Sequence, residues 1–505
     1  MERKNRIISR SILVLLLLSI ILYSIIVGEK VPLNDGAGWD GAIFRNMASS
    51  FWNSPIGAYN SYSIQRIFPF VLINLVYVCL NISIDNASLM LGMHITNVLF
   101  LVLGIYFFFR ISDFYKYSVK VEIIAFVSLF FNVQTLKFMG YMPFITDYVA
   151  VNLAIILFYY FLTKQDAKML IVGFVGAFNY PTYLLITLCL YVLPRVSFDI
   201  SNSVMEIKYQ RYMMFIKSFF IYLLIPLLVL IVYYTNVYCL GNTGLIHFCD
   251  RTYTPLINEY VLVVSCLCTM WYIYRMLKPI NFNIRDFFNV FLINLKLKRV
   301  VIGLLVFFIV KLLISFLADP NATPYYKWDV FAKHLVQGQA RLPFLYIETR
   351  LMYLGLVYLL IILNWKRLCK VVGNYGFGYI ALTFLMMIFS VDVESRRSFN
   401  LLPFILFPLC EIFNNAQFRK SEIVIYVSLS LLFSMFWFNF NVPGIKYAFE
   451  NWEIEVLNFP AQRYFMFGGT LQSNEVYIVV SSLLIILFCL LCIGYKKGLF
   501  KSFVK

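Results

Sequence analysis

The sequence predicts an all-α integral membrane protein, a polytopic bundle of about 13 or 14 transmembrane helices with short outer loops and juxtamembrane helices. Of its 505 residues, 61% are hydrophobic and only 13% are charged, and the mean hydropathy is +0.80. A soluble protein of this length needs a much larger polar surface. Apolar runs recur from Ser11 to Gly494 without a polar stretch long enough for a second core. The whole chain, 1–505, is therefore predicted to be one membrane domain.

The predicted spans are apolar stretches, most of them near the length of about 20 residues that a helix needs to cross a bilayer. They cover 11–27, 87–109, 119–137, 147–163, 168–178, 181–193, 218–236, 256–276, 300–318, 344–363, 374–390, 398–413, 422–440 and 476–494. Two of them, 168–178 and 181–193, are too short to cross alone, so they are either separate short spans or one span broken at Pro181. The apolar stretch 67–80 is also short, and we expect it to lie as a helix at the outer face.

The distribution of basic residues predicts the orientation. If the N-terminus is inside, the cytoplasmic segments hold 28 of the 42 lysines and arginines, as the positive-inside rule requires. Counting 67–80 as a full crossing would invert every later loop and violate that rule. Both termini are therefore predicted to be cytoplasmic, in the inner or plasma membrane of a bacterium. The formal charge of +17 lies in short clusters between spans and forms no continuous basic face for nucleic acid.

This orientation places the long outer segments at 28–86, 237–255, 319–343, 391–397 and 441–475. We expect an N-terminal module over 1–236, which contains the first outer loop, and a more variable helical part over 237–505. The inner segment 275–299 alternates basic and aromatic residues, which predicts an amphipathic helix on the cytoplasmic leaflet. Of the ten cysteines, only Cys239 and Cys249 flank an outer loop and are placed to form a disulfide.

The first outer loop contains the most informative residues. Glycines on both sides of Asp40 let the backbone turn tightly and leave room for a ligand beside the carboxylate. Trp39 and Phe44 would shield this carboxylate from water, which makes it a stronger proton acceptor. A solvated Asp-Gly turn above an interfacial aromatic belt is the alternative explanation.

Several short motifs resemble those of the GT-C superfamily of integral membrane glycosyltransferases. The resemblance is carried by Asp40-Gly41 with Phe44, by Arg66 with Pro69, by Asp147 at the start of the fourth span, and by Glu394-Ser395-Arg396-Arg397 with Pro403. It covers roughly the first 200 residues by order of elements, together with this late outer loop.

The resemblance implies a transferase that takes a single sugar from a polyprenyl-phosphate donor. The acceptor, a cell-surface glycan or another lipid-linked molecule, would face the same outer side. Asp40 would accept the proton of the acceptor hydroxyl, and Asp147 would orient the acceptor or share that role. Arg66, Arg396 and Arg397 would hold the departing phosphate. Several members of the superfamily place a divalent metal between such carboxylates, so Mg²⁺ or Mn²⁺ is left open as a cofactor.

Other candidate substrate-binding residues lie outside these motifs or beside them. Glu394 adjoins the two late arginines, and Lys327, His334 and Arg341 lie in the outer loop before the tenth span, among aromatic residues suited to stacking on sugars. A polar rim with an interfacial aromatic belt explains most of that loop equally well, and His334 is expected at the surface. Lys311 lies inside the ninth span, where it either neutralises a lipid phosphate or extends to the membrane surface.

The last outer loop, 441–475, is short, which favours a single sugar over a large oligosaccharide as the donor's transferred group.

Two other functions are open. A multi-span polysaccharide polymerase or ligase would place functional arginines in late outer loops, and the length of its product would identify it. A transporter or flippase for lipid-linked sugars would use broken helices such as the one at Asn179-Tyr180-Pro181, and it would move substrate without a covalent product.

Overall fold

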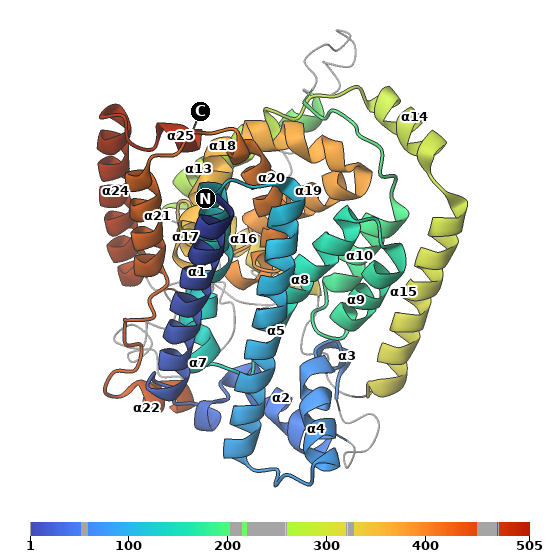
Figure 1. Ribbon diagram of the computed structural model, residues 1–505, viewed down its shortest axis with the longest axis vertical. Helices are drawn as coiled ribbons and strands as arrows, with labels where there is room; N and C mark the ends of the chain where they lie inside the picture. The colour runs from blue at the N-terminus through green and yellow to red at the C-terminus, as the bar shows by residue number, and fades with distance from the viewer. Residues whose placement is uncertain are drawn as a thin grey trace. The chain divides into compact units, whose positions relative to one another are not determined.

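The computed structural model (Figure 1) describes residues 2–51, 59–201, 215–219, 258, 260–319, 321, 328–451, 472 and 474–504. Every regular element within these residues is a helix, so the predicted all-α class is confirmed there. The chain divides into two compact units, each built from three segments. Unit 1 comprises Met1–Pro194, Leu295–Tyr326 and Phe399–Asn441, and unit 2 comprises Arg195–Asn294, Lys327–Ser398 and Val442–Lys505. The predicted division between 236 and 237 lies outside the described residues.

Unit 1 is built around two helices in close contact, α5 (Asn86–Tyr115) and α8 (Asp147–Leu162). A Cβ atom on Gly104 of α5 would lie only 1.9 Å from Oδ1 of Asn152 on α8, so the glycine permits the contact. The other elements of this unit are α1 (Glu2–Ile26), η1 (Asn34–Gly36), α2 (Trp39–Ser50), α3 (Ser61–Ile64), α4 (Phe68–Cys79), α6 (Val119–Phe130), η2 (Gln134–Phe138), α7 (Met139–Tyr141), α9 (Asp166–Ala177), α10 (Tyr183–Val192), α15 (Leu297–Leu317), α20 (Leu402–Asn414) and α21 (Lys420–Phe433).

Unit 2 is also helical throughout its described residues. Its elements are α13 (Leu262–Leu277), α14 (Ile284–Asn294), α16 (Trp328–Ala340), α17 (Leu345–Leu354), α18 (Leu356–Val372), η5 (Gly373–Tyr375), α19 (Phe377–Ser390), η6 (Ser395–Ser398), α22 (Ile445–Asn451), α24 (Asn474–Lys496) and α25 (Lys501–Val504). Helix α14 forms inside the segment predicted to be amphipathic, and none of its residues is buried.

Several helices are suited to crossing a membrane. Within the described residues, α1, α5, α15 and α24 are long and apolar enough, and the number rises to six if each of two bent pairs is one span. These helices indicate a membrane protein, although the full-length spans among the described residues are fewer than the 13 or 14 predicted for the whole chain. Helices such as α8, with 16 residues, and α10, with 10, are shorter than a straight crossing requires. The predicted span 218–236 lies almost wholly outside the described residues.

Helices α9 and α10 form an antiparallel hairpin, so the alternative of one span broken at Pro181 is wrong. A Cβ atom on Gly173 would lie 2.2 Å from Cγ2 of Thr187, and one on Gly176 would lie 2.1 Å from Cδ1 of Tyr183. These contacts bring residues on the two sides of the turn at 178–182 directly against each other. The glycines make the approach possible because they carry no side chain.

The predicted span 344–363 is also not one straight helix. Helices α17 and α18 differ in direction by 119° and meet at Gly355, whose φ of +77° is a conformation that glycine adopts at little cost. The predicted span 119–137 bends by 53° between α6 and the short helices η2 and α7. Hydropathy does not reveal these bends, because the two sides of each bend together are apolar enough to be read as one span.

The two ends of unit 1 carry different structures. At one end, the N-terminal part of α1 meets the end of α5, where Arg10 lies 2.5 Å from Asp113 and 2.7 Å from Glu122. At the other end lie α2 and α4, where α1 ends and α5 begins (Figure 1). The basic N-terminus and the described part of the first loop, 28–86, therefore lie at opposite ends of this unit. The side of the membrane that each end faces stays a prediction.

The contact between α9 and α10 gives a first testable prediction. Gly176→Ala should destabilise the protein by about 1–3 kcal/mol, because the new methyl group would overlap the ring of Tyr183. That ring is fully buried and its hydroxyl donates to the carbonyl of Ala150, so it cannot move aside freely. Thermal unfolding of the detergent-solubilised protein measures the loss.

Gly494→Ala in α24 is the matched control, because its added methyl group would lie 3.3 Å from the nearest side-chain atom, on Phe500. Both changes raise helix propensity. Equal melting temperatures for the two variants would show that the close contact at Gly176 is absent.

Candidate functional site

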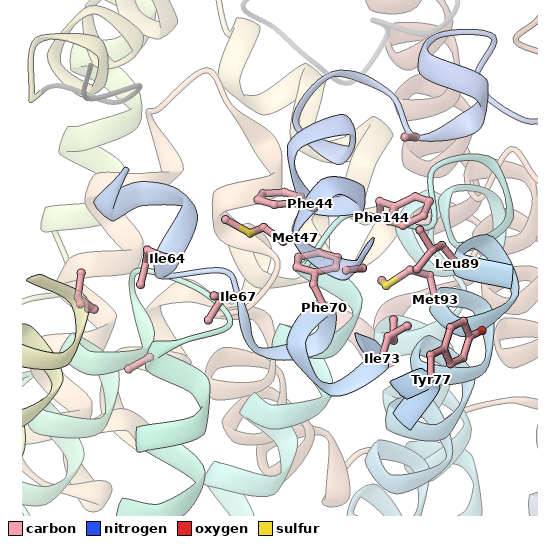
Figure 2. Close-up of a cluster of buried hydrophobic side chains, with 14 of the residues drawn as sticks. Phe44, Met47, Ile64, Ile67, Phe70, Ile73, Tyr77, Leu89, Met93 and Phe144 are labelled. Carbon is pink, nitrogen blue, oxygen red and sulfur yellow. The ribbon is translucent and has the colours of Figure 1, made fainter. Parts of the chain in front are cut away.

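A buried hydrophobic cluster fixes helix α2, which carries Asp40. Phe44 of α2 stacks on Phe70 of α4 with ring centroids 4.9 Å apart. Figure 2 shows these two rings with Met47 of α2 beside them, and with Met93 of α5 and Phe144 in the same cluster. All of these side chains are at most 2% exposed. The position of Asp40 is therefore set by packing rather than by a loose loop.

The glycines that flank Asp40 have two different roles. Gly38 immediately precedes α2 and has a φ of +77°, so it makes the tight turn that the sequence predicted. A Cβ atom on Gly41 would lie 3.0 Å from Cβ of Phe144, so this glycine allows protein packing rather than leaving open space for a ligand. Asp40 itself is partly buried in the first turn of α2, where a negative charge is favoured by the helix dipole.

Asp147 lies in the same part of unit 1. It is buried, with 2% exposure, and begins α8 three residues after Phe144. The contact between Gly41 and Phe144 thus brings the segment before Asp147 against the first turn of α2. The two carboxylates that the sequence predicted to act together come from neighbouring segments of one unit.

Arg66 is built into this region by contacts with three segments. Its Nη1 donates a hydrogen bond of 2.9 Å to Oγ1 of Thr146, the residue before Asp147. Its guanidinium also lies over the rings of Tyr62 and Tyr180, 4.6 Å from each centroid. Cation–π contacts of a desolvated arginine are worth about 2 kcal/mol or more each. Arg66 is therefore held in one orientation beside Asp147.

The turn of the α9–α10 hairpin completes the region with polar residues. The carbonyl of Phe178 accepts a hydrogen bond from the backbone N–H of Phe68 at 2.9 Å. Asn179 donates through Nδ2 to the carbonyl of Thr146 at 3.2 Å, and Asn400, just before α20, donates to Oγ1 of Thr182 at 2.6 Å. Sequence reasoning used Asn179 only as a helix breaker and did not select Asn400, because neither belongs to a recognisable motif.

Unit 2 contains a second group of charged residues, which we call the late-loop cluster: Asp392, Glu394, Arg396, Arg397 and His334. Arg397 lies 2.5 Å from Asp392 through Nη1 and 2.7 Å from Glu394 through Nη2. Its Nη2 is also 2.8 Å from Nδ1 of His334. Arg396 pairs with Glu394 and is more exposed than Arg397. The sequence predicted all but Asp392 as site residues, and the structure brings those four together.

Arg350 supports this cluster and was missed from the sequence. It is fully buried, and its Nη1 donates to the carbonyls of Tyr346 at 2.9 Å and Asp392 at 2.6 Å. Its Nε donates to Oγ of Ser398 at 3.1 Å. The bonds tie both ends of the 392–398 segment to α17. The sequence did contain one signal for Arg350, because this charged residue lies inside an apolar run, where a charge needs partners.

His334 is buried rather than at the surface, which corrects the sequence-based expectation. Only 4% of the residue is exposed, because α16 packs against the 391–393 segment, where a Cβ on Gly338 would lie 2.3 Å from the carbonyl oxygen of Val391. Burial lowers the pKa of His334 to about 4, with a smaller lowering by Arg396, although Glu394 raises it. The neutral ring accepts the hydrogen bond from Arg397 at Nδ1.

Arg341 lies in a separate buried network of unit 2. It is 1% exposed and donates to the backbone carbonyl of Gln472, whose side chain donates to Glu348 at 2.5 Å. Burial lowers the pKa of Arg341 to about 10. Arg341, which the sequence predicted to bind substrate or phosphate, therefore contacts other protein groups in the described structure.

The remaining predicted site residues lie apart from these groups. Lys311 is exposed on α15, with Nζ 5.9 Å from the ring centroid of Phe307. Lys327 and both cysteines of the predicted disulfide, Cys239 and Cys249, lie outside the described residues. In the described part of the chain, no group of three or more His, Cys, Asp or Glu side chains could hold a metal ion.

The chain matches no family model, and it has no significant match among curated proteins or solved structures.

The burial of His334 predicts a specific dependence of stability on pH. Its folded pKa of about 4 lies below its ordinary value of 6.5, so the unfolded state binds the proton first as pH falls. The stability that neutral His334 contributes is present above about pH 6.5, and up to roughly 3 kcal/mol is lost as pH falls toward 4. Thermal unfolding between pH 7.5 and 4.5 measures this loss.

His334→Gln tests the assignment, because the glutamine amide oxygen accepts a hydrogen bond from Arg397 but does not titrate in this range. We expect the melting temperature of this variant to fall less steeply with pH than that of the wild type. Parallel curves for the two proteins would assign the loss of stability to other groups.

Proposed function

We propose that this chain is a membrane glycosyltransferase that transfers a single sugar from a polyprenyl-phosphate donor to an acceptor on the outer face of the membrane. The observation that carries the proposal is the arrangement of Asp40, Asp147 and Arg66 at the end of unit 1 opposite its basic N-terminus. Two carboxylates and a rigidly held cation are the groups that displacement of a lipid phosphate requires.

In the proposed reaction, the acceptor hydroxyl attacks the anomeric carbon of the donor. A new carbon–oxygen bond forms as the bond to the phosphate oxygen breaks, and the polyprenyl phosphate leaves with the bonding electrons. Asp40 accepts the proton of the attacking hydroxyl, while Asp147 orients that hydroxyl. Arg66 stabilises the negative charge on the departing phosphate.

The geometry suits these roles for physical reasons. Asp147 and Arg66 are 2% and 5% exposed, so charges there interact in a medium with little water. The tyrosine rings on both sides of the Arg66 guanidinium limit its rotation, so little side-chain entropy is lost when a phosphate binds. The polyprenyl chain is apolar and would lie in the bilayer that α1, α5 and α15 cross.

The late-loop cluster favours a second candidate function. Arginines concentrated in a late loop are expected of a polysaccharide polymerase or ligase, and Arg350, Arg396 and Arg397 gather around the 392–398 segment. Such an enzyme would build long chains from lipid-linked units. Size analysis of the product separates the two proposals, because a transferase of the first kind adds one sugar.

Substitution of the carboxylates tests the proposed mechanism. Asp40→Asn should lower the rate of sugar transfer by about 10²–10⁴-fold, because the amide cannot accept the proton. Asp147→Asn should also impair transfer, through loss of acceptor orientation. The assay measures radiolabelled sugar transferred from undecaprenyl-phosphate sugars to membrane acceptors, normalised to the amount of folded protein.

Asp35→Asn is the matched control, because Asp35 is an exposed carboxylate in the same loop. Its φ of +52° is a conformation that asparagine tolerates well. We expect this variant to retain activity. Full activity of purified, folded Asp40→Asn protein would rule out Asp40 as the base.

A further inference from the structure

We propose that Asn179 and Asn400 bind hydroxyl groups of the donor's sugar, an inference that rests on the proposed function. Asn179 belongs to the turn between α9 and α10, and Asn400 contacts this turn at Thr182. The same turn contains Tyr180, whose ring lies against the guanidinium of Arg66. They would recognise the sugar while Arg66 holds the phosphate.

Asn179 presents a buried acceptor that lacks a hydrogen-bond partner. The residue is 0% exposed, and its Nδ2 donates to the carbonyl of Thr146. Because a carbonyl can only accept, this bond fixes the orientation of the amide and leaves Oδ1 as the acceptor on the other side. Oδ1 is buried and has no partner among the described residues. Such unsatisfied groups are costly and uncommon in folded proteins.

Asn400 presents a second unsatisfied polar atom. It is 2% exposed, its Nδ2 is 2.6 Å from the hydroxyl of Thr182, and its Oδ1 has no partner in the described structure. The hydroxyl of Thr182 can donate or accept, so the amide could also be turned by 180°. In either orientation one polar atom is left unsatisfied. A sugar hydroxyl both donates and accepts, so it satisfies the remaining atom in both cases.

The location distinguishes these two residues from Asn74, another buried asparagine. Asn74 on α4 also has an unpartnered Oδ1, while its Nδ2 donates to the carbonyl of Ala48 at 2.7 Å. Only Asn179 and Asn400, among these three, contact the segments that carry Thr146 and Tyr180, the described partners of Arg66. When the phosphate of a ligand binds Arg66, the group attached to that phosphate therefore lies near the hairpin turn. In a sugar phosphate, that group carries several hydroxyls.

Binding measurements on the full-length protein in lipid nanodiscs test the inference without requiring transfer. The probes are undecaprenyl phosphate alone and undecaprenyl phosphate linked to glucose, mannose, galactose or arabinose. We expect the wild type to bind at least one sugar conjugate more tightly than undecaprenyl phosphate. Asn179→Leu and Asn400→Leu should each reduce that preference by about 5- to 10-fold, with little change in affinity for undecaprenyl phosphate.

Asn74→Leu is the matched control and should retain the full preference for the conjugate. Asn179→Ser, which removes the amide with less steric change, replaces the leucine variant if that protein does not fold. An equal loss of affinity for the conjugate and for undecaprenyl phosphate would overturn the inference, because the asparagines would then act on the phosphate or on the fold. An unchanged preference would also overturn it and indicate that water satisfies the amides.

The same data separate this inference from the proposed function. A wild-type protein that binds no sugar conjugate more tightly than undecaprenyl phosphate would contradict both proposals. A wild type that shows the preference, with variants that keep it, would contradict only the role of the two asparagines.

Discussion

The burial of Arg66 is the constraint on which the candidate site in unit 1 depends. Removing a guanidinium from water costs several kcal/mol unless nearby groups compensate. The compensation comes from three parts of the chain, because Tyr62 precedes α4, Thr146 precedes α8 and Tyr180 lies in the hairpin turn. Folding around this one cation therefore brings together segments that are separated by more than 100 residues in the sequence.

The hairpin turn extends the same principle to the backbone. In a membrane protein, irregular backbone is tolerated where other protein groups satisfy its polar atoms. Here Phe68 donates to the carbonyl of Phe178, and Asn179 donates to that of Thr146. These bonds connect the start of α4 and the start of α8 to the turn. A polar region can thus exist next to the apolar cluster around Phe44 and Phe70.

The sequence predicted the helical class because hydropathy is a local property of the chain, and for the same reason it identified Asp40, Arg66 and Asp147 as candidates from local motifs. It could not predict the bend at Gly355 or decide between two separate helices and one broken span at 168–193, since tertiary contacts determine whether an apolar run continues straight. The burial of His334 was missed for the same reason, because a residue in a polar loop can be covered by a distant segment. Asn400 gives no signal in the sequence, as its hydrogen bond to Thr182 joins residues more than 200 positions apart.

The contacts of Arg397 argue for a structural role of the late-loop cluster. Its two terminal nitrogens already contact Asp392, Glu394 and His334, and a phosphate would have to displace these partners and leave two carboxylates partly buried without their cation. Breaking such a buried pair costs roughly 3–5 kcal/mol. Arg350 holds the same segment through the carbonyl of Asp392 and Oγ of Ser398, so the cluster is best explained as the support of the 392–398 segment. The proposed chemistry of sugar transfer is then placed in unit 1, where both candidate carboxylates and Arg66 lie within the first 150 residues.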